Sequence, residues 1–251
     1  MNVKAALITG AAHRIGRALA LGFAGDGWDI GLHYNNSARA AAESQTRIRA
    51  LGARCELYQS DFRRPEQAEA LVSAFRRDFP EGSLLINSAS IFRRDRLASL
   101  EPALWDQHMT INALLPALLT RAFAAAAVDG ICVINLLDQK VGNLTPDFFS
   151  YTVSKCALLA ITRMLALELA PKVRVNAIAP GLVLQSGDQS KKGFERAFNA
   201  TPLEVGPSVE ELCRAAALIA ESPAMTGQVI TIDGGRHMMA SKPPYDDLPK
   251  D

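Results

Sequence analysis

The sequence lacks the close spacings that paired cysteines and metal ligands usually show. Its four cysteines, Cys55, Cys132, Cys156 and Cys213, form no CxxC pair, and its four histidines are equally scattered. Disulfide frameworks and zinc sites are usually marked by short, regular intervals between such residues. We therefore expect a cytoplasmic protein with reduced thiols and no bound metal.

An excess of charge of one sign and long apolar runs are also missing. Lysine plus arginine number 27 against 26 acidic residues, so the formal net charge is +1. A chain this balanced has no overall field to hold a polyanion, which argues against nucleic acid as a partner. The longest apolar stretch, Asn112 to Val128, contains Pro116 and Arg121 and is too short for a membrane span. We therefore expect no membrane partner.

Short β-branched runs alternate with longer helical patterns along the 251 residues. This alternation is typical of repeated βαβ units and a parallel sheet. The predicted strands are 3–9, 29–34, 54–59, 83–87, 130–136, 174–179 and 228–232. The predicted helices are 15–25, 37–51, 65–79, 101–127, 149–170 and 208–220. The pattern predicts one α/β domain over residues 1–239 with a seven-stranded parallel sheet.

Two segments break this alternation. Residues 182–200 are polar at their centre and follow a predicted strand. A long polar loop beyond the carboxyl end of a strand is a candidate substrate lid. Residues 240–251 are rich in proline and charge, and we expect them to form a C-terminal tail outside the domain.

The first predicted strand runs into a glycine turn that includes Thr9, Gly10 and Gly16, and a helix follows. Backbone N–H groups in such a turn, together with a helix N-terminus, can face a pyrophosphate. An ordinary strand-to-helix turn is the alternative. The commoner fingerprint has a further glycine at position 14, where this chain has Arg14. This cation either reaches a phosphate or a ligand beside the nicotinamide, or it is a solvated surface residue.

The end of the second strand carries no acidic side chain, since its residues are His33, Tyr34, Asn35, Asn36 and Ser37. An NAD-specific domain offers an Asp or Glu to the ribose diol at this place. Neutral donors accept an additional 2′-phosphate without repelling it, so the predicted cofactor is NADPH. The alternative is that the last two of these residues only cap the next helix.

Tyr151 and Lys155 are four residues apart in a predicted helix, so their side chains share one face. A phenol with a pKa of ~10 is a poor acid–base group near neutral pH, and a neighbouring ammonium favours the phenolate. We therefore expect Lys155 to lower the pKa of Tyr151.

These motifs resemble the short-chain dehydrogenase/reductase family over the range Leu7 to Gly235. The other matching stretches are Asp61, Asn87-Ser88-Ala89-Ser90, Asn112, Pro180-Gly181, Thr226-Gly227 and Asp233-Gly234-Gly235. The resemblance implies a single doubly wound Rossmann domain. It also implies that Tyr151 donates the proton, and that Lys155 adjusts the pKa of this tyrosine and holds the nicotinamide ribose. By the same resemblance, Asp61 contacts the adenine and Asn112 anchors a water relay behind Lys155. The candidate cofactor-binding residues are Gly10, Arg14, Ile15, Gly16, His33, Tyr34, Asn35, Asn36, Ser37, Asp61, Phe62, Asn87, Ser88, Ala89, Ser90, Tyr151, Lys155, Pro180, Gly181 and Val183.

One departure from the family pattern bears on the substrate. The family usually has a serine thirteen residues before the tyrosine, and this chain has Asp138. An ionised carboxylate only accepts hydrogen bonds and repels a developing alkoxide. A nitrogen heterocycle with N–H groups therefore fits better than a plain ketone. The alternative is that Asp138 is paired with Lys140 or an arginine and plays no part in the chemistry.

A set of cleft residues resembles the pteridine reductases and the bacterial dihydromonapterin or dihydrofolate reductases of this family. In that branch an aromatic side chain stacks the pterin over the nicotinamide. The candidate substrate-binding residues are Arg14, Ser90, Phe92, Asp138, Tyr151 and Leu184. Alternatively, Phe92 is an ordinary wall residue and Ser90 only tolerates the close approach of the cofactor. The run Arg93-Arg94-Asp95-Arg96 is interpreted as a solvated loop.

The predicted function is NADPH-dependent reduction of a pterin or dihydropteridine, with Tyr151, Lys155, Asp138 and Asn112 as catalytic residues. A carbonyl or 3-oxoacyl reductase of the same family and a non-catalytic NADPH-binding sensor are the alternatives. Residues 111–128 and 158–169 are apolar on nearly every face, and a helix of this kind is buried on its second side too. We therefore expect a homo-oligomer, a dimer or tetramer, in which these helices pair with their copies.

Overall fold

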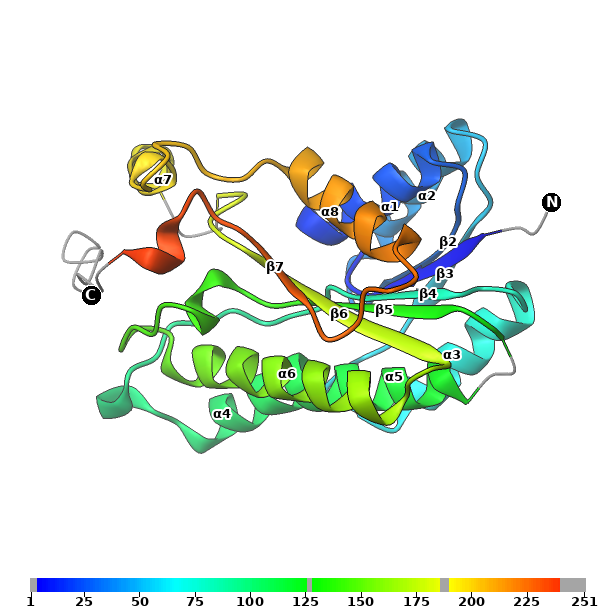
Figure 1. The fold of residues 1–251 in the computed structure, drawn as a ribbon, viewed down its shortest axis with the longest axis horizontal. Helices are drawn as coiled ribbons and strands as arrows, with labels where there is room; N and C mark the ends of the chain where they lie inside the picture. Colours follow the sequence, from blue (N-terminus) through cyan, green and yellow to red (C-terminus); the bar gives the residue numbers. More distant parts are fainter. Residues whose placement is uncertain (1–3, 126–127, 186–189, 240–251) are drawn as a thin grey trace.

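Seven parallel strands form one sheet in the order β3-β2-β1-β4-β5-β6-β7, as Figure 1 shows. The structure is a computed structural model that describes residues 4–125, 128–185 and 190–239. The strands are β1 (Ala5–Ile8), β2 (Asp29–Tyr34), β3 (Cys55–Gln59), β4 (Leu84–Asn87), β5 (Ile131–Leu136), β6 (Val173–Pro180) and β7 (Val229–Ile232). The prediction of a seven-stranded parallel sheet is confirmed.

The chain runs outward from β1 to the edge strand β3 and then returns to continue from β4 to β7. β1 therefore pairs with β2 on one side, starting at Ala5↔Asp29, and with β4 on the other, starting at Ala6↔Leu84. In a doubly wound sheet the carboxyl ends of the strands form a crevice where the winding changes direction. The crevice beyond β1 and β4 is the position that the fold provides for a ligand.

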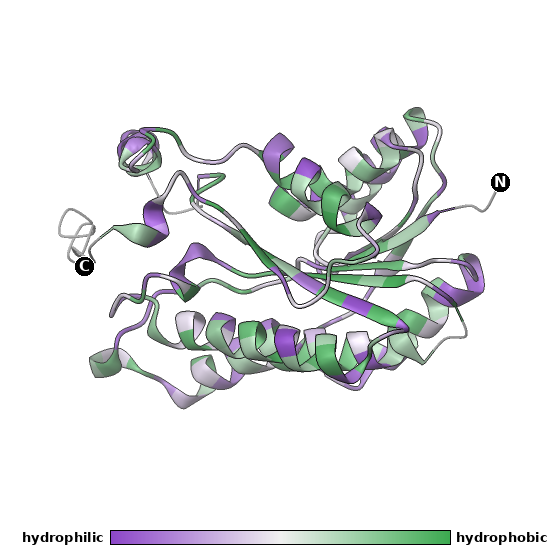
Figure 2. Cartoon of the chain, in the orientation of Figure 1, coloured by the Kyte–Doolittle hydropathy of each residue, from purple (hydrophilic) through white to green (hydrophobic). Residues whose placement is uncertain are grey.

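Helices cover both faces of the sheet (Figure 1). On one face lie α1 (Arg14–Gly25), α2 (Ala38–Ala50) and α8 (Val209–Glu221). On the other lie α3 (Gln67–Asp78), α4 (Pro102–Met109), α5 (Leu115–Ala124) and α6 (Phe149–Glu168). Strands covered on both sides are expected to be apolar throughout, and every residue of β1, β4 and β5 is buried. Figure 2 shows this hydrophobic sheet between helices whose outer faces carry the hydrophilic residues.

The helix predicted over 101–127 is present over 102–124, but a π-helical turn divides it into α4 and α5. Residues Thr110–Leu114 form a π-helical turn between α4 and α5. Pro116 has no N–H group to donate to the carbonyl of Asn112 four residues earlier, so an uninterrupted α-helix cannot pass this point. The interruption sets Asn112 in the middle of the turn. Residues 126 and 127 lie outside the described residues.

The predicted lid over 182–200 contains a helix, α7 (Lys191–Asn199), where we expected a loop. Ser190 caps it by accepting a hydrogen bond from the Gly193 N–H at 3.1 Å. Phe194 and Phe198, one turn apart, have ring centroids separated by 5.4 Å. The cap and this i,i+4 pair are the local signals for the helix. Residues 186–189 of the predicted lid, and the predicted tail, lie outside the described residues.

The two apolar segments, for which we predicted pairing with their copies, are partly buried within the chain. Leu115 and Leu158 are buried, whereas Leu114 in the first segment is 45% exposed. Met164 and Leu167 on α6 are 65% and 84% exposed. A homo-oligomer stays a prediction, and the exposed residues of α6 are where we expect its contact. No helix among the described residues is both long and apolar enough to cross a membrane.

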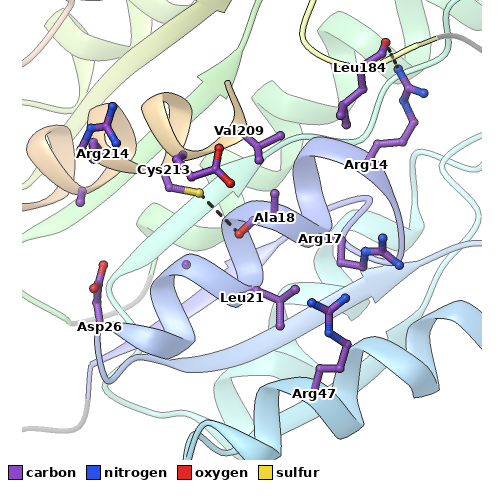
Figure 3. A pocket seen from close by; sticks show the side chains of 13 residues that line it. Arg14, Arg17, Ala18, Leu21, Asp26, Arg47, Leu184, Val209, Cys213 and Arg214 are labelled. Atoms are coloured by element: carbon purple, nitrogen blue, oxygen red, sulfur yellow. Dashed lines mark hydrogen bonds between the residues drawn. The ribbon is translucent and has the colours of Figure 1, made fainter. Parts of the chain in front are cut away.

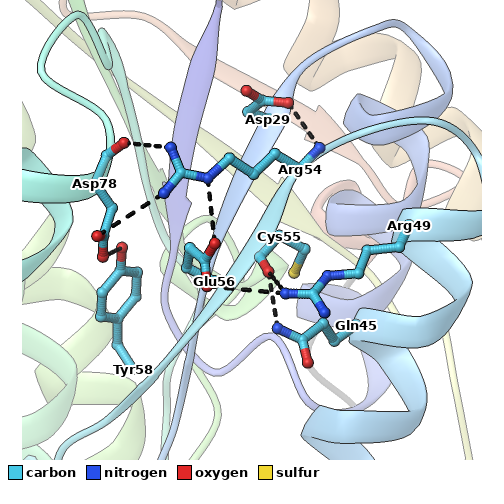
Figure 4. A network of polar contacts seen from close by, with 8 residues as sticks. All are labelled: Asp29, Gln45, Arg49, Arg54, Cys55, Glu56, Tyr58 and Asp78. Carbon is cyan, nitrogen blue, oxygen red and sulfur yellow. Dashed lines mark hydrogen bonds and ion pairs between the residues drawn. The ribbon is translucent and has the colours of Figure 1, made fainter.

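A polar network ties the edge strand β3 to the helices on both sides, as Figure 4 shows. Arg54 donates to Glu56 Oε1 at 3.2 Å and to the Asp78 carbonyl at 2.7 Å. Tyr58 Oη donates to Asp78 Oδ2 at 2.7 Å. On the α2 side, Arg49 donates to the Cys55 carbonyl at 2.8 Å. These residues stabilise an otherwise open sheet edge.

Candidate active site

The turn after β1 is closely packed against the end of β4. Gly10 has a φ of +65°, and a Cβ at this position would lie 2.8 Å from the Ala89 Cα. A Cβ on Gly16 would lie 2.5 Å from the Gly10 carbonyl oxygen. Thr9 Oγ1 accepts from the N–H groups of Ser88 and Ala89, both at 3.0 Å. Larger residues at either glycine would therefore push the turn off the sheet.

Arg14 occupies the position of the missing glycine with a φ of +54°, a left-handed conformation that is unfavourable for a residue with a Cβ. Its guanidinium donates to the carbonyl oxygens of Gln185 at 2.7 Å and Leu184 at 3.1 Å. The turn is thus connected to the segment that follows β6. The structure brings together two of the predicted substrate residues, Arg14 and Leu184.

His33 lies behind the glycine turn and is buried. Its Nδ1 accepts from the Gly10 N–H at 3.1 Å, so Nε2 carries the proton and donates to the Ser60 carbonyl at 3.1 Å. The ring stacks on Phe62 at 4.1 Å between centroids. Burial lowers the pKa of His33 to about 4, so the ring is neutral. Both nitrogens are occupied, and His33 supports the turn from beneath.

The other candidates around the predicted adenosine site lie at the ends of β2 and β3. Ser37 precedes α2, and its side chain makes no capping hydrogen bond. The alternative that Ser37 only caps the helix is therefore not supported, and its hydroxyl is left for other contacts. Asp61 is bound by Arg63 at 2.7 Å, and these hydrogen bonds lower the pKa of the Asp61 carboxyl to about 2. Its contact with adenine remains a prediction.

Asn112, in the π-helical turn, joins β4 to α6. Its Oδ1 accepts from the Ile91 N–H at 3.0 Å and from Ser90 Oγ at 3.1 Å. Its Nδ2 donates to Ser154 Oγ at 3.0 Å and to the Ile91 carbonyl at 3.1 Å. The side chain is fully buried, and the α6 residue that it contacts is Ser154, which precedes Lys155 in the chain. Its predicted role in a water relay stays a prediction.

Tyr151 and Asp138 face each other across the cleft. Tyr151 Oη donates to Asp138 Oδ2 at 2.9 Å, and Asp138 Oδ1 accepts from the Lys140 N–H at 2.9 Å. Lys155 Nζ donates to the Leu136 carbonyl at 2.7 Å and lies 5.8 Å from the centroid of the Tyr151 ring. The Lys140 ammonium donates to Thr145 Oγ1 instead of forming an ion pair with Asp138. Among the described residues, Asp138 forms no ion pair with Lys140 or an arginine, so the alternative that it serves only in such a pair is not supported.

The pKa of Tyr151 moves in the direction opposite to our expectation. Burial and the Asp138 carboxylate raise the pKa of Tyr151 well above its ordinary value. Burial is the larger cause, because it disfavours the charged phenolate, and Asp138 adds to it, since a carboxylate stabilises the protonated phenol where a serine would not. Desolvation also raises the pKa of Asp138 and lowers the pKa of Lys155 to about 8. The phenol therefore carries a proton at neutral pH, and Asp138 Oδ2 accepts its hydrogen bond.

Phe92 forms the aromatic wall of this cleft. Its ring lies 4.7 Å from that of Tyr151 in an edge arrangement and 4.2 Å from that of Phe148 in a stacked arrangement. Phe92 is 45% exposed, so part of the ring faces solvent. Phe148 adopts a φ of +57°, which no local sequence signal indicates. No spacing or motif in the sequence therefore points to Phe148 as part of this wall.

Buried hydrogen bonds connect the loop after Phe92 to the first turn of α6, and no sequence motif indicated them. Ser150 Oγ contacts His108 Nδ1 at 2.6 Å and donates to Asp95 Oδ2. The Ser150 N–H donates to Asp95 Oδ1 at 3.1 Å. Residue spacing could not reveal this set, because its members are 42 and 55 positions apart. Among the described residues, no cluster of three or more His, Cys, Asp or Glu side chains suits a metal.

A groove of about 650 Å³ runs along the outer side of α1, between α2 and α8 (Figure 3). Arg14 and Leu184 line one end of it, whereas Arg17 and Arg47 lie on the α2 side. Neither Tyr151 nor the other residues that contact its ring belong to the lining. The groove therefore does not include the Tyr151–Asp138 pair.

Residues 10–237 match a short-chain dehydrogenase family model described as enoyl-(acyl carrier protein) reductase. The match spans most of the chain, and the chain therefore belongs to the short-chain dehydrogenase/reductase family. An uncharacterized oxidoreductase of Mycobacterium tuberculosis is 32% identical, over 94% of this chain and 92% of that protein. The 3-oxoacyl-(acyl-carrier-protein) reductase FabG of Staphylococcus aureus is 27% identical, over 94% of this chain and 98% of that protein.

Two crystal structures resemble this chain over nearly its whole length. The FolM alternative dihydrofolate reductase 1 of Brucella suis, in complex with NADP, has a TM-score of 0.90 and 37% identity, covering 95% of this chain and 96% of that chain. The corresponding protein of Brucella canis, also complexed with NADP, has a TM-score of 0.92 and 36% identity, covering 98% of each chain.

Proposed function

We propose that the chain is an NADPH-dependent reductase of a pterin or dihydropteridine. The observation that carries the proposal is the 2.9 Å hydrogen bond from Tyr151 Oη to Asp138 Oδ2, beside the partly exposed ring of Phe92. This site combines a proton donor, an acceptor for N–H groups and an aromatic surface. A flat heterocycle with ring N–H groups can use all three.

Two observations support NADPH as the cofactor: the side chains at the end of β2 and the cofactor bound to the Brucella proteins. Residues 33–37 contain no carboxylate, and the Ser37 hydroxyl is not used as a helix cap. Both Brucella relatives were crystallised with NADP. Gly10, Gly16 and the N-terminus of α1 would receive the pyrophosphate, and Asn36 and Ser37 the 2′-phosphate. The cofactor, when bound, supplies the hydride for the substrate.

The protein's own residues control the proton. Tyr151 holds it on Oη, because burial and Asp138 keep the phenol protonated at neutral pH. Lys155, with a pKa of about 8, is mostly charged at pH 7 and stays next to the phenol through its bond to the Leu136 carbonyl. A substrate ring nitrogen that takes the proton from Oη is oriented by Asp138, which accepts a neighbouring N–H. Phe92 excludes water from one side of the ring.

The FabG relatives favour a second candidate, a 3-oxoacyl reductase. In that reaction negative charge develops on a carbonyl oxygen, and the Asp138 carboxylate would face it. Such a contact destabilises the transition state instead of stabilising it. For this reason we place the carbonyl reductase second.

The experiment that tests the proposal compares NADPH oxidation with dihydrobiopterin, dihydromonapterin, dihydrofolate and an acetoacetyl thioester. We expect turnover with at least one dihydropteridine and little with the thioester. Turnover of the thioester alone would establish the carbonyl reductase. Binding of NADPH without oxidation by any of the four compounds would support a sensor.

A further inference from the structure

The loop that follows Phe92 separates its charges in an unusual way. Arg93, Arg94 and Arg96 are exposed, whereas Asp95 within the same run is only 3% exposed. The Asp95 carboxylate accepts hydrogen bonds from Ser150 at the start of α6, so its charge is directed into the protein. The three arginines therefore face solvent, whereas the negative charge of Asp95 does not.

The second acid near this loop is buried as well. Asp147 is fully buried, and its Oδ1 accepts from Arg96 Nε at 2.5 Å and from Arg94 Nη2 at 3.4 Å. Two guanidinium groups thus share one carboxylate, and their side chains are 40% and 50% exposed. Together with Arg93, the loop presents three positive charges to solvent over two buried negative ones.

The position of this cluster relates it to the cleft. Asp147 directly precedes Phe148, whose ring stacks on Phe92 at 4.2 Å, and Phe92 in turn contacts Tyr151. Arg93 and Arg94 directly follow Phe92 in the chain, so a substrate ring beside Phe92 and Tyr151 would have these exposed arginines near its outward substituent. A carboxylate at this edge gains charge-assisted hydrogen bonds with partly desolvated guanidinium groups.

Building on the proposed function, we propose that Arg93, Arg94 and Arg96 form a subsite for an anionic substituent of the dihydropteridine, and that they select substrates with a carboxylate-bearing tail. Asp147 is a positioning residue that holds Arg94 and Arg96 at the cleft mouth. The loop is then a specificity element, in contrast to its interpretation from the sequence as a solvated loop.

The test uses two substrates that share the dihydropterin ring. Dihydrofolate carries a tail with carboxylates, and dihydrobiopterin carries a neutral side chain. We expect Arg94→Gln to raise the KM for dihydrofolate ~3–10-fold, the range for one partly exposed charge-assisted contact, with kcat nearly unchanged. The KM for dihydrobiopterin should stay the same. Added salt should raise only the KM for dihydrofolate, because screening weakens only the charged contact.

Three further variants control for structural damage. Arg93→Gln should show the same selective effect, and Arg94→Lys should keep most of the affinity because it retains the charge. Arg77→Gln changes an exposed residue of α3 at the opposite end of the strands, and it should leave the KM for both substrates unchanged. If Arg93→Gln and Arg94→Gln change the KM for both substrates equally, the subsite is overturned. It is also overturned if these variants change neither KM. Both outcomes leave the proposed function intact. No turnover of dihydrofolate or dihydrobiopterin by the wild-type enzyme would overturn the subsite, and the proposed function would fall as well only if dihydromonapterin is not reduced either.

Discussion

Replacing Asp138 by serine separates the two enzyme functions most directly. In this variant Tyr151 loses the carboxylate that accepts its hydrogen bond at 2.9 Å, and the substrate loses an acceptor for its N–H groups. We expect dihydropteridine turnover to fall by ~10²-fold or more, about 2.7 kcal/mol in activation free energy, as for a lost acid–base participant. Ketone activity should be kept or should rise, because serine donates to a carbonyl oxygen.

The same variant has a spectroscopic consequence that does not depend on the substrate. Burial and Asp138 both raise the pKa of Tyr151, so removing the carboxylate should bring this pKa down toward its ordinary value. The change can be measured as tyrosinate absorbance against pH in Asp138→Ser. Subtracting the titration of the Asp138→Ser/Tyr151→Phe double variant isolates the phenol concerned.

A matched control is Asp106→Ser, at an exposed position on α4, which should leave activity and titration unchanged. Activity is followed by the loss of NADPH absorbance with each substrate at saturating cofactor. Unchanged dihydropteridine reduction in Asp138→Ser, together with an unchanged tyrosine titration, would refute the role given to Asp138. A fall in both dihydropteridine and ketone activity would show that the change damages the cleft in general.

Three other predictions concern the cofactor, the assembly and pH-dependent stability. NADPH should bind at least ~10-fold more tightly than NADH, about 1.4 kcal/mol, and Asn36→Asp should reverse this preference in fluorescence titrations; equal affinities would contradict it. Light scattering should give at least twice 27.0 kDa, and Met164→Glu or Leu167→Glu should lower that mass; a wild-type monomer would rule out the predicted contact. The pKa of His33 is about 4 in the folded chain against 6.5 for a free histidine, so the unfolded chain binds the additional proton first as pH falls. Unfolding free energy should therefore decrease from about pH 6.5 to about pH 4, by on the order of 2–3 kcal/mol, and chemical denaturation of His33→Gln should show a smaller slope over this interval.

Much of the fold followed from local patterns in the chain. The alternation of strands and helices, the glycine turn at Gly10 and the shared face of Tyr151 and Lys155 all depend on neighbours within a few residues. The errors occurred where local patterns compete. Pro116 divides an apolar stretch that is otherwise helical, and Ser190 begins a helix within a segment that its polar composition marks as a loop.

The sequence by itself therefore determined which elements form and which chemical groups reach the carboxyl edge of the sheet, because periodicity and spacing are properties of short segments. Only the tertiary structure decided how those groups are paired. Asp138 raises the pKa of Tyr151 because both are desolvated in one cleft, although 13 residues separate them. Asp147 gathers Arg94 and Arg96 from positions 53 and 51 residues away. Such pairings depend on the packing of distant elements and on the loss of water around them, which no short segment of sequence records.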